Sequence, residues 1–119
     1  MRRMNLSSIE QGELVVADIM FAEQSGKKRR LGLVLSNSEF NKNSKDVIVL
    51  KVTSSARKTE YAIQLENENT ENKALKKESM IMSDFPVTLA KENILARPDK
   101  INIEKLREVK NKVKKIYGL

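Results

Sequence analysis

Arginine, lysine, carboxylate and hydroxyl side chains are the groups with which this chain of 119 residues could carry out chemistry, because it contains no histidine and no cysteine. The absence of histidine removes the usual general base and the commonest metal ligand. The absence of cysteine excludes disulfides and cysteine-ligated zinc. Asp18, Asp46 and Asp84 stand apart in the sequence, and no phosphate-binding or dinucleotide-binding glycine motif occurs. We therefore expect no metal site and no cofactor.

The densest group of charges is a run of four cations, Lys27, Lys28, Arg29 and Arg30. The whole chain carries a formal net charge of +7 and has a pI of about 9.7. A basic surface attracts phosphate backbones and releases their counterions on binding. This charge indicates a polyanionic partner, for which nucleic acid and a disordered acidic protein both qualify. The run by itself is equally compatible with a purely solubilising role.

The composition is that of a single compact domain, with 39% hydrophobic and 33% charged residues. No apolar run approaches the roughly 20 residues of a membrane span, and the first residues lack a signal-like apolar core. We therefore expect a cytoplasmic protein with no membrane partner. The predicted domain covers residues 1–119, with an N-terminal extension over residues 1–11.

Strands must position the charged groups, because the chain contains several short runs rich in β-branched residues, which favour strands. The predicted strands cover residues 13–21, 31–36, 46–53, 59–65, 79–83 and 87–89, the last two separated by Pro86. Residues 22–30 are expected to form a basic hairpin loop, and residues 66–77 a polar loop. Residues 37–45 are expected to form a turn or a brief helical turn in which Phe40 enters the core.

The C-terminal segment has helical periodicity. Apolar residues recur every three or four positions after Asn102, a suitable N-cap, and the pattern ends at Gly118. An amphipathic helix over residues 102–117 is predicted. Together the elements predict a mainly β protein with a C-terminal helix (α+β), built as a small antiparallel, SH3-like barrel.

Several stretches of the chain follow one another in a distinctive order: residues 12–18 (GELVVAD), 30–37 (RLGLVLSN), 47–55 (VIVLKVTSS), 75–82 (LKKESMIM) and the closing Tyr117-Gly118-Leu119. In this order they resemble the successive signatures of the MazF/PemK toxin family. The resemblance spans the chain from about Gly12 to the C-terminus. It implies the compact β-barrel fold shared with CcdB-like gyrase poisons, and assembly as a homodimer.

The resemblance also implies the site. The family's arginine at the start of the second strand corresponds to Arg30, and its hydroxyl residue at the end of the third strand corresponds to Thr53. Arg30 suits phosphate because guanidinium forms bidentate bonds and stays charged, although its high pKa makes it a poor general base. Whether Arg30 acts as acid and base or only as an electrostatic stabiliser stays open. The candidate RNA-binding residues are Lys27, Lys28, Arg29, Ser36, Asn37, Ser54 and Ser55.

The chain departs from the family pattern at two places. Leu31 follows Arg30 where the family usually has proline, which affects how the second strand begins. Around Asp84 and Phe85 the family more often has glutamine followed by an apolar and a basic residue, so the RNA contacts there are expected to differ. Among the few aromatic residues, Phe21, Phe40 and Phe85 are expected in the core, which leaves Tyr61 to stack on a base.

The implied function is a sequence-specific, metal-independent endoribonuclease toxin of a type II toxin–antitoxin system. It would cut single-stranded RNA by attack of the 2′-hydroxyl, leaving a 2′,3′-cyclic phosphate and a 5′-hydroxyl, and a cognate antitoxin would hold it inactive. Two alternatives stay open: a non-enzymatic CcdB-like poison of a protein target, and a degenerate member that only binds nucleic acid or antitoxin.

Overall fold

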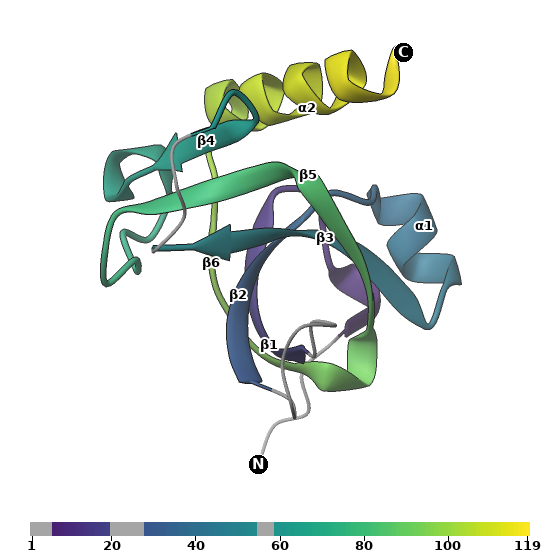
Figure 1. The fold of residues 1–119 in the computed structure, drawn as a ribbon. Helices are drawn as coiled ribbons and strands as arrows, with labels where there is room; N and C mark the ends of the chain where they lie inside the picture. Colours follow the sequence, from purple (N-terminus) through teal and green to yellow (C-terminus); the bar gives the residue numbers. More distant parts are fainter. Residues whose placement is uncertain (1–5, 20–27, 55–58) are drawn as a thin grey trace.

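A computed structural model of the chain describes residues 6–19, 28–54 and 59–119 (Figure 1). Six strands form one antiparallel sheet in the order β4-β5-β3-β2-β1-β6. The strands are β1 (Glu13–Ile19), β2 (Lys28–Val34), β3 (Asp46–Thr53), β4 (Ala62–Leu65), β5 (Ser79–Ala90) and β6 (Ile94–Lys100). The helices are α1 (Ser38–Asn43) and α2 (Ile103–Tyr117), and short 3-10 turns occur at Leu6–Ser8, Asn67–Asn69 and Lys91–Asn93. The predicted α+β architecture is confirmed.

The sheet is strongly bent, so that β1, β2, β3 and β5 curve round a common centre while α2 lies outside the curve (Figure 1). Because side chains alternate across a strand, each face of the sheet has its own core. The inner core comprises Ile9, Val15, Ala17, Ile19, Val34, Val47, Val49, Leu89 and Ile94. The helix-side core comprises Leu14, Leu33, Leu50, Val52, Ile63, Leu65, Ile81, Ile101 and Val109. Ile9 is fully buried, so the residues just before β1 pack into the domain.

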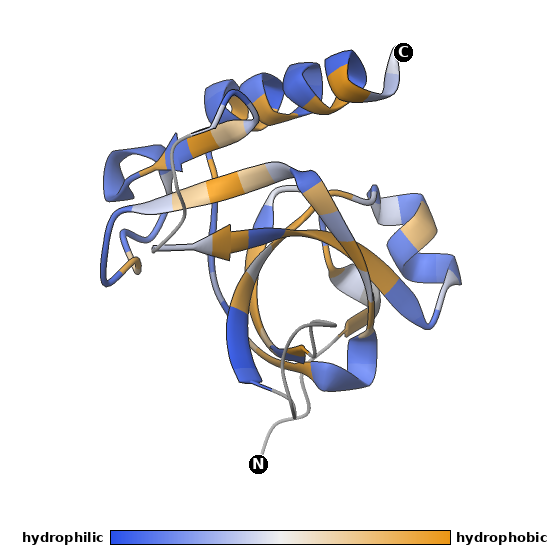
Figure 2. Ribbon diagram, viewed as in Figure 1, coloured by the Kyte–Doolittle hydropathy of each residue, from blue (hydrophilic) through white to orange (hydrophobic). Residues whose placement is uncertain are grey.

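Helix α2 confirms the predicted amphipathic helix. The Asn102 side chain accepts a hydrogen bond of 2.8 Å from the Lys105 N–H, as an N-cap should. Gly118 adopts the left-handed conformation, with φ 72°, and ends the helix. Val109 is fully buried between the helix and the sheet, and Figure 2 shows the apolar stripe along α2 against its polar outer surface.

The basic hairpin differs from its prediction, because β2 begins at Lys28 rather than at residue 31. Pairing with β1 extends to Ile19↔Lys28, with Asp18↔Arg29 and Ala17↔Arg30 between. Lys28, Arg29 and Arg30 are therefore strand residues and not loop residues. The ladder with β1 overrides the weak strand preference of consecutive cations.

The segment around Pro86 is also different from its prediction. Residues 79–90 form one strand, β5, in which Pro86 lies opposite Leu50. The register shifts between Leu50 and Val52, where the single residue Lys51 on β3 faces residues 82–85 of β5. This bulge lets the strand continue past a residue that cannot donate to the ladder. Strand β6, which follows, has no counterpart in the predicted strands.

Phe40 is 40% exposed, so its expected place in the core is wrong. Its neighbour Asn41 is fully buried instead. The Asn41 amide donates to the carbonyls of Ile9 and Ser36 at 3.0 Å each and accepts a hydrogen bond from the Ser36 hydroxyl. A polar side chain thus fills the inward position because it satisfies backbone groups that a phenyl ring would leave without partners.

Candidate functional site

The β2–β3 ladder brings Arg30 and Thr53 together. In the register of these two strands Leu31 pairs with Val52 and Gly32 with Lys51, and continuing the register by one residue places Arg30 opposite Thr53. Directly opposite residues share a face and have Cβ atoms about 4.5–5.5 Å apart. Both side chains are half-buried. The two residues assigned to one site by family resemblance are therefore cross-strand neighbours.

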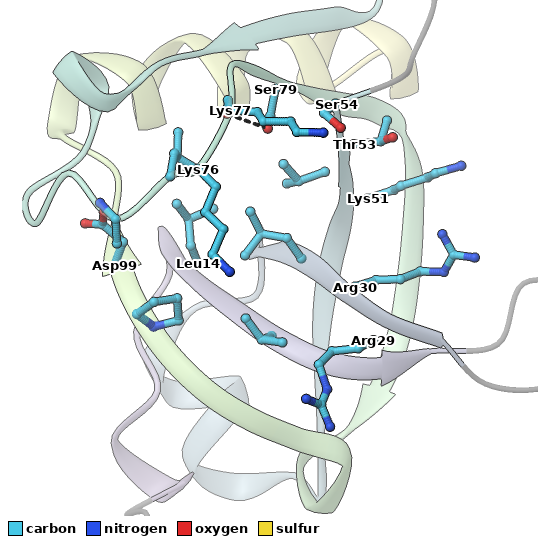
Figure 3. Close-up of a pocket in the computed structure, with 16 residues that line it drawn as sticks. Leu14, Arg29, Arg30, Lys51, Thr53, Ser54, Lys76, Lys77, Ser79 and Asp99 are labelled. Carbon is cyan, nitrogen blue, oxygen red and sulfur yellow. Dashed lines mark hydrogen bonds between the residues drawn. The ribbon is translucent and has the colours of Figure 1, made fainter.

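The same face carries two further side chains. Lys51 lies two residues before Thr53 on β3, and its ammonium group is 5.0 Å from the centre of the Phe85 ring. The pair Val49↔Val87 on β3 and β5 leads directly to Lys51 and Phe85 when its register is continued. We call Arg30, Lys51, Thr53 and Phe85 the Arg30 cluster. In Figure 3 the Arg30 and Lys51 side chains point to the same side, away from Leu14 and Lys76.

The cluster occupies the end of the inner core. Val49 lies two residues before Lys51 on β3, and Ala17 of β1 lies opposite Arg30. Both are fully buried. Gly32, opposite Lys51, lies close to Val49, because a Cβ at Gly32 would come within 3.1 Å of the Val49 side chain. The cations therefore rise from a packed base, which restricts their mobility near the backbone.

A groove of about 520 Å³ crosses the ends of β2 and β3 (Figure 3). Leu14, Val16, Leu31 and Val52 contribute apolar surface to it. The cations among its lining residues are Arg29, Arg30, Lys51, Lys76 and Lys77, whereas Asp99 is the single carboxylate among the lining residues described. This excess of positive charge favours a polyanionic ligand.

Asp99 and Asn67 fix the loop that brings Lys76 and Lys77 to the groove. The Asp99 carboxylate accepts hydrogen bonds of 2.8 Å from the backbone N–H groups of Asn72 and Ala74. The Asn67 side chain donates to the Leu75 carbonyl at 3.0 Å and accepts from the Leu75 N–H at 2.9 Å. Loop residues 66–78 are thus held in shape from two sides.

The pKa of Asp99 lies below its ordinary value. Burial alone would raise the pKa of this carboxyl. The backbone N–H groups of Ala74, Asn72 and Lys100 stabilise the ionised form and lower the pKa by more than burial raises it. The carboxylate charge of Asp99 therefore serves to hold the loop.

A second group of carboxyls lies on the same loop, away from the Arg30 cluster. The pKa of Glu66 is raised to about 7 by hydrogen bonding to Glu68, by burial, and by the charges of Glu68 and Glu78. Two like charges close together cannot both ionise at low cost, so one proton is retained. This loop is the part of the described chain whose charge changes near neutral pH.

The remaining predicted RNA-binding residues are dispersed. Arg29 and Ser54 line the groove, and Lys28 is exposed on β2. Lys27 and Ser55 lie outside the described residues. Ser36 is almost fully buried and accepts a hydrogen bond of 2.9 Å from the Ile48 N–H, and Asn37 caps α1. Since about 20 Å of strand separates Ser36 from Arg30, the structure does not bring Ser36 and Asn37 to the site.

Sequence reasoning missed Lys51, Phe85, Lys76 and Lys77 as site residues. The alternation of strand side chains contains the signal for Lys51, because positions 51 and 53 of one strand share a face. Phe85 was assigned to the core, but it is 38% exposed. Its position depends on the β5 bulge, and that of the two lysines depends on Asp99 from a distant strand. Neither the bulge nor the contact with Asp99 can be predicted from the local sequence.

Within residues 6–19, 28–54 and 59–119, no group of three or more histidine, cysteine, aspartate or glutamate residues is arranged to hold a metal ion. None of the helices in this part of the chain is long and apolar enough to cross a membrane.

The fold and the Arg30 cluster define a small bent-sheet protein with a cationic face at one end of its barrel. A family model described as PemK-like, MazF-like toxin of type II toxin-antitoxin system matches residues 10–117, and the chain belongs to this family. The family resemblance found in the sequence is thereby confirmed. A comparison with curated proteins gives no match.

Solved structures with a similar fold include ones from Deinococcus radiodurans and from Mycobacterial species. A MazE–MazF structure from Deinococcus radiodurans has a TM-score of 0.77 and 21% identity, with 94% of this chain and 98% of that chain covered. An endoribonuclease from Mycobacterial species has a TM-score of 0.75 and 15% identity, with 98% and 97% covered. The Mycobacterium tuberculosis toxin MazF-mt6 has a TM-score of 0.73 and 14% identity, with 90% and 97% covered. At these identities the comparisons show a shared fold.

Proposed function

We propose that this chain is the toxin of a type II toxin–antitoxin pair and acts as a sequence-specific endoribonuclease on single-stranded RNA without a metal ion. Family membership over residues 10–117 supports the toxin assignment, and the similar fold of an endoribonuclease from Mycobacterial species is consistent with the activity. The observation that carries the proposal is the juxtaposition of Arg30 and Thr53 on one face of the β2–β3 ladder. The whole of residues 1–119 would act as one cytoplasmic toxin domain.

In the proposed reaction the ribose 2′-oxygen bonds to the adjacent phosphorus while the bond from phosphorus to the 5′-oxygen breaks. The 2′-hydroxyl loses its proton and the departing 5′-oxygen gains one, which leaves a 2′,3′-cyclic phosphate and a 5′-hydroxyl. Arg30 would stabilise the extra negative charge of the pentacoordinate transition state through bidentate hydrogen bonds. The Thr53 hydroxyl would hold a phosphate oxygen or orient the nucleophile. Lys51, beside both, adds positive charge to the same face.

The cations of the groove supply the binding energy for the RNA backbone. Arg29, Lys76 and Lys77 line it together with the apolar residues described above. Each phosphate contact displaces condensed counterions, so binding should weaken steeply as salt is raised. The exposed Lys28 would extend this surface.

A cognate antitoxin is the proposed regulatory partner. Structures of similar fold include a MazE–MazF complex from Deinococcus radiodurans and a mycobacterial endoribonuclease in complex with its antitoxin. An acidic segment that folds on binding would match the positive groove of this chain and exclude RNA from it. The toxin itself is proposed to act as a homodimer.

The test is incubation of the purified protein with mixed-sequence single-stranded RNA in excess EDTA, followed by analysis of the fragment ends. We expect discrete cuts with 5′-hydroxyl ends. Arg30→Ala should reduce the rate about 100- to 1000-fold, the effect of removing one transition-state donor. Arg29→Ala is the matched comparison at saturating RNA, because Arg29 is the same residue type on the opposite face of β2. As a cation of the groove it should weaken RNA binding and raise KM, but lower kcat far less than Arg30→Ala does.

Two other outcomes would identify the alternatives. RNA left intact across many sequences, with retained binding to nucleic acid or antitoxin, would indicate a degenerate binding module. Intact RNA with no nucleic-acid binding would favour a CcdB-like poison of a protein target. Equal losses of kcat in Arg30→Ala and Arg29→Ala would remove the assignment of the reaction to the Arg30 cluster.

A further inference from the structure

Lys51 and Phe85 form a pair of side chains of which the reaction above uses only the positive charge of Lys51. Lys51 lies 5.0 Å from the centre of the Phe85 ring. The two residues come from neighbouring strands and point to the face that carries Arg30 and Thr53. The pair therefore lies directly beside the proposed reaction centre.

Phe85 is held at the surface by the backbone rather than left there by chance. Residues 82–85 of β5 face the single residue Lys51 of β3, and the register shift at this bulge lies beside the ring. The three consecutive residues from Asp84 to Pro86 are exposed. Phe85 is 38% exposed in a chain with only three phenylalanines and no tryptophan. A bulge that presents a scarce aromatic ring next to two cations is a feature of binding surfaces.

The chemistry of the pair fits one ligand. A phenyl ring offers a flat face on which any nucleobase can stack, and such stacking is independent of hydrogen-bond pattern. An ammonium group above a ring is attracted by the quadrupole of that ring and keeps its charge for a phosphate. A ring and a cation at 5.0 Å can thus engage the base and the phosphate of one nucleotide together.

We propose that Lys51 and Phe85 form a nucleotide subsite beside the scissile phosphate, in which Phe85 stacks on an unpaired base and Lys51 contacts the adjoining backbone phosphate. This subsite rests on the proposed function, since it places the RNA across the Arg30 cluster. It assigns base stacking to Phe85 instead of Tyr61, because the Phe85 ring lies beside Lys51 in the Arg30 cluster.

The subsite is tested by binding, independently of cleavage. The probes are 2′-O-methyl RNA octamers of mixed sequence, which cannot be cut because the 2′-oxygen is blocked. Phe85→Leu should weaken binding about 5- to 150-fold, the range for loss of one stacked base. Phe85→Tyr should bind within about twofold of the parent, since the ring is kept. Phe40→Leu is the matched control, because Phe40 is equally exposed, at 40%, but lies on α1, and it should have no effect.

Lys51→Gln should weaken binding and lower the slope of log affinity against log salt by about 0.7, the value for one single-strand phosphate. Thermal melts of each variant confirm that the fold is retained. Binding of Phe85→Leu within twofold of the parent, or a parent that binds none of the octamers, would overturn the subsite.

Cleavage of unmodified RNA by the parent protein is measured in parallel. If the parent cuts RNA and Phe85→Leu leaves octamer binding unchanged, the subsite is refuted and the proposed function is kept. Octamer binding that depends on Phe85, without cleavage, would support the subsite and refute the nuclease.

Discussion

Asp99 offers the sharpest test of how the groove is built. Its carboxylate accepts three backbone N–H groups, those of Asn72, Ala74 and Lys100, at 2.8 Å each. In Asp99→Asn the oxygen that faces Ala74 can become an amide nitrogen. The side-chain NH2 and the Ala74 N–H would then both be donors and could not form a hydrogen bond. The loss of one bond to a charged acceptor, at about 1.5–3 kcal/mol, and the weakening of two others predict a destabilisation of about 2–4 kcal/mol in total.

The free energy of unfolding is measured by urea denaturation at pH 7, followed by far-ultraviolet circular dichroism at one fixed protein concentration. Hydrogen exchange at the amides of Asn72 and Ala74 reports the loop itself. Asp84→Asn, a change of the same type at an exposed position, serves as the control. If the urea midpoint of Asp99→Asn equals that of Asp84→Asn, Asp99 does not hold the loop in place.

The pH dependence of the Asp99 effect has a definite sign. The pKa of Asp99 is lower in the folded protein than in the unfolded chain, so its ionised form stabilises the fold above the unfolded pKa. This contribution is lost as the pH falls through the folded pKa. The stability difference between the parent and Asp99→Asn should therefore be full at neutral pH and shrink in acid. A difference that stayed constant down to strongly acidic pH would contradict the role of the charge.

Other parts of the structure lead to further predictions. The pKa of Glu66 is raised to about 7 in the folded protein, so its stabilising proton is fully bound below the unfolded pKa and lost as the pH rises through about 7. Glu66→Gln should accordingly leave stability unchanged below the ordinary carboxyl pKa of 4.5 and increase it at pH 8. Urea midpoints at pH 4 and pH 8 test this prediction, and a reversed order would show that the repulsion from Glu68 is not the cause. Asn41→Ala should destabilise the fold by about 2–4 kcal/mol, because the Ile9 and Ser36 carbonyls lose their amide donor. A loss below about 1 kcal/mol on denaturation would mean that water replaces the side chain. Gly118→Ala should cost about 1 kcal/mol through its left-handed φ of 72° alone, since the added Cβ meets no atom within 4 Å; an unchanged melting temperature would exclude that strain.

The parts of the fold that sequence predicted well are those governed by local periodicity. The helix after Asn102 follows from the three- or four-residue spacing of its apolar side chains and from its capping residues, and the strand before Thr53 follows from its run of β-branched residues. Both were found. The start of β2 was misplaced, because three consecutive cations resemble a loop until the ladder with β1 is known. The break expected at Pro86 failed for a related reason, since the bulge opposite Lys51 is a property of two strands together.

The residues of the candidate site could likewise be predicted from the sequence only in part. Arg30 and Thr53 were assigned by family resemblance, and their adjacency follows from strand pairing, which no single segment encodes. Lys51 was recoverable in principle from its spacing to Thr53. Phe85 was not, because an aromatic residue in an apolar run has the same sequence signature whether it faces the core or the solvent.

The clamp formed by Asn67 and Asp99 has an evolutionary consequence. The Asn67 and Asp99 side chains, rather than those of Lys76 and Lys77, form the hydrogen bonds that fix the backbone path of residues 66–78. The loop conformation therefore does not depend on which side chains stand at the exposed positions 76 and 77. Substitutions there would alter the chemistry presented to a ligand without refolding the loop. A lineage could thus diversify what it recognises one residue at a time, each step starting from an intact scaffold.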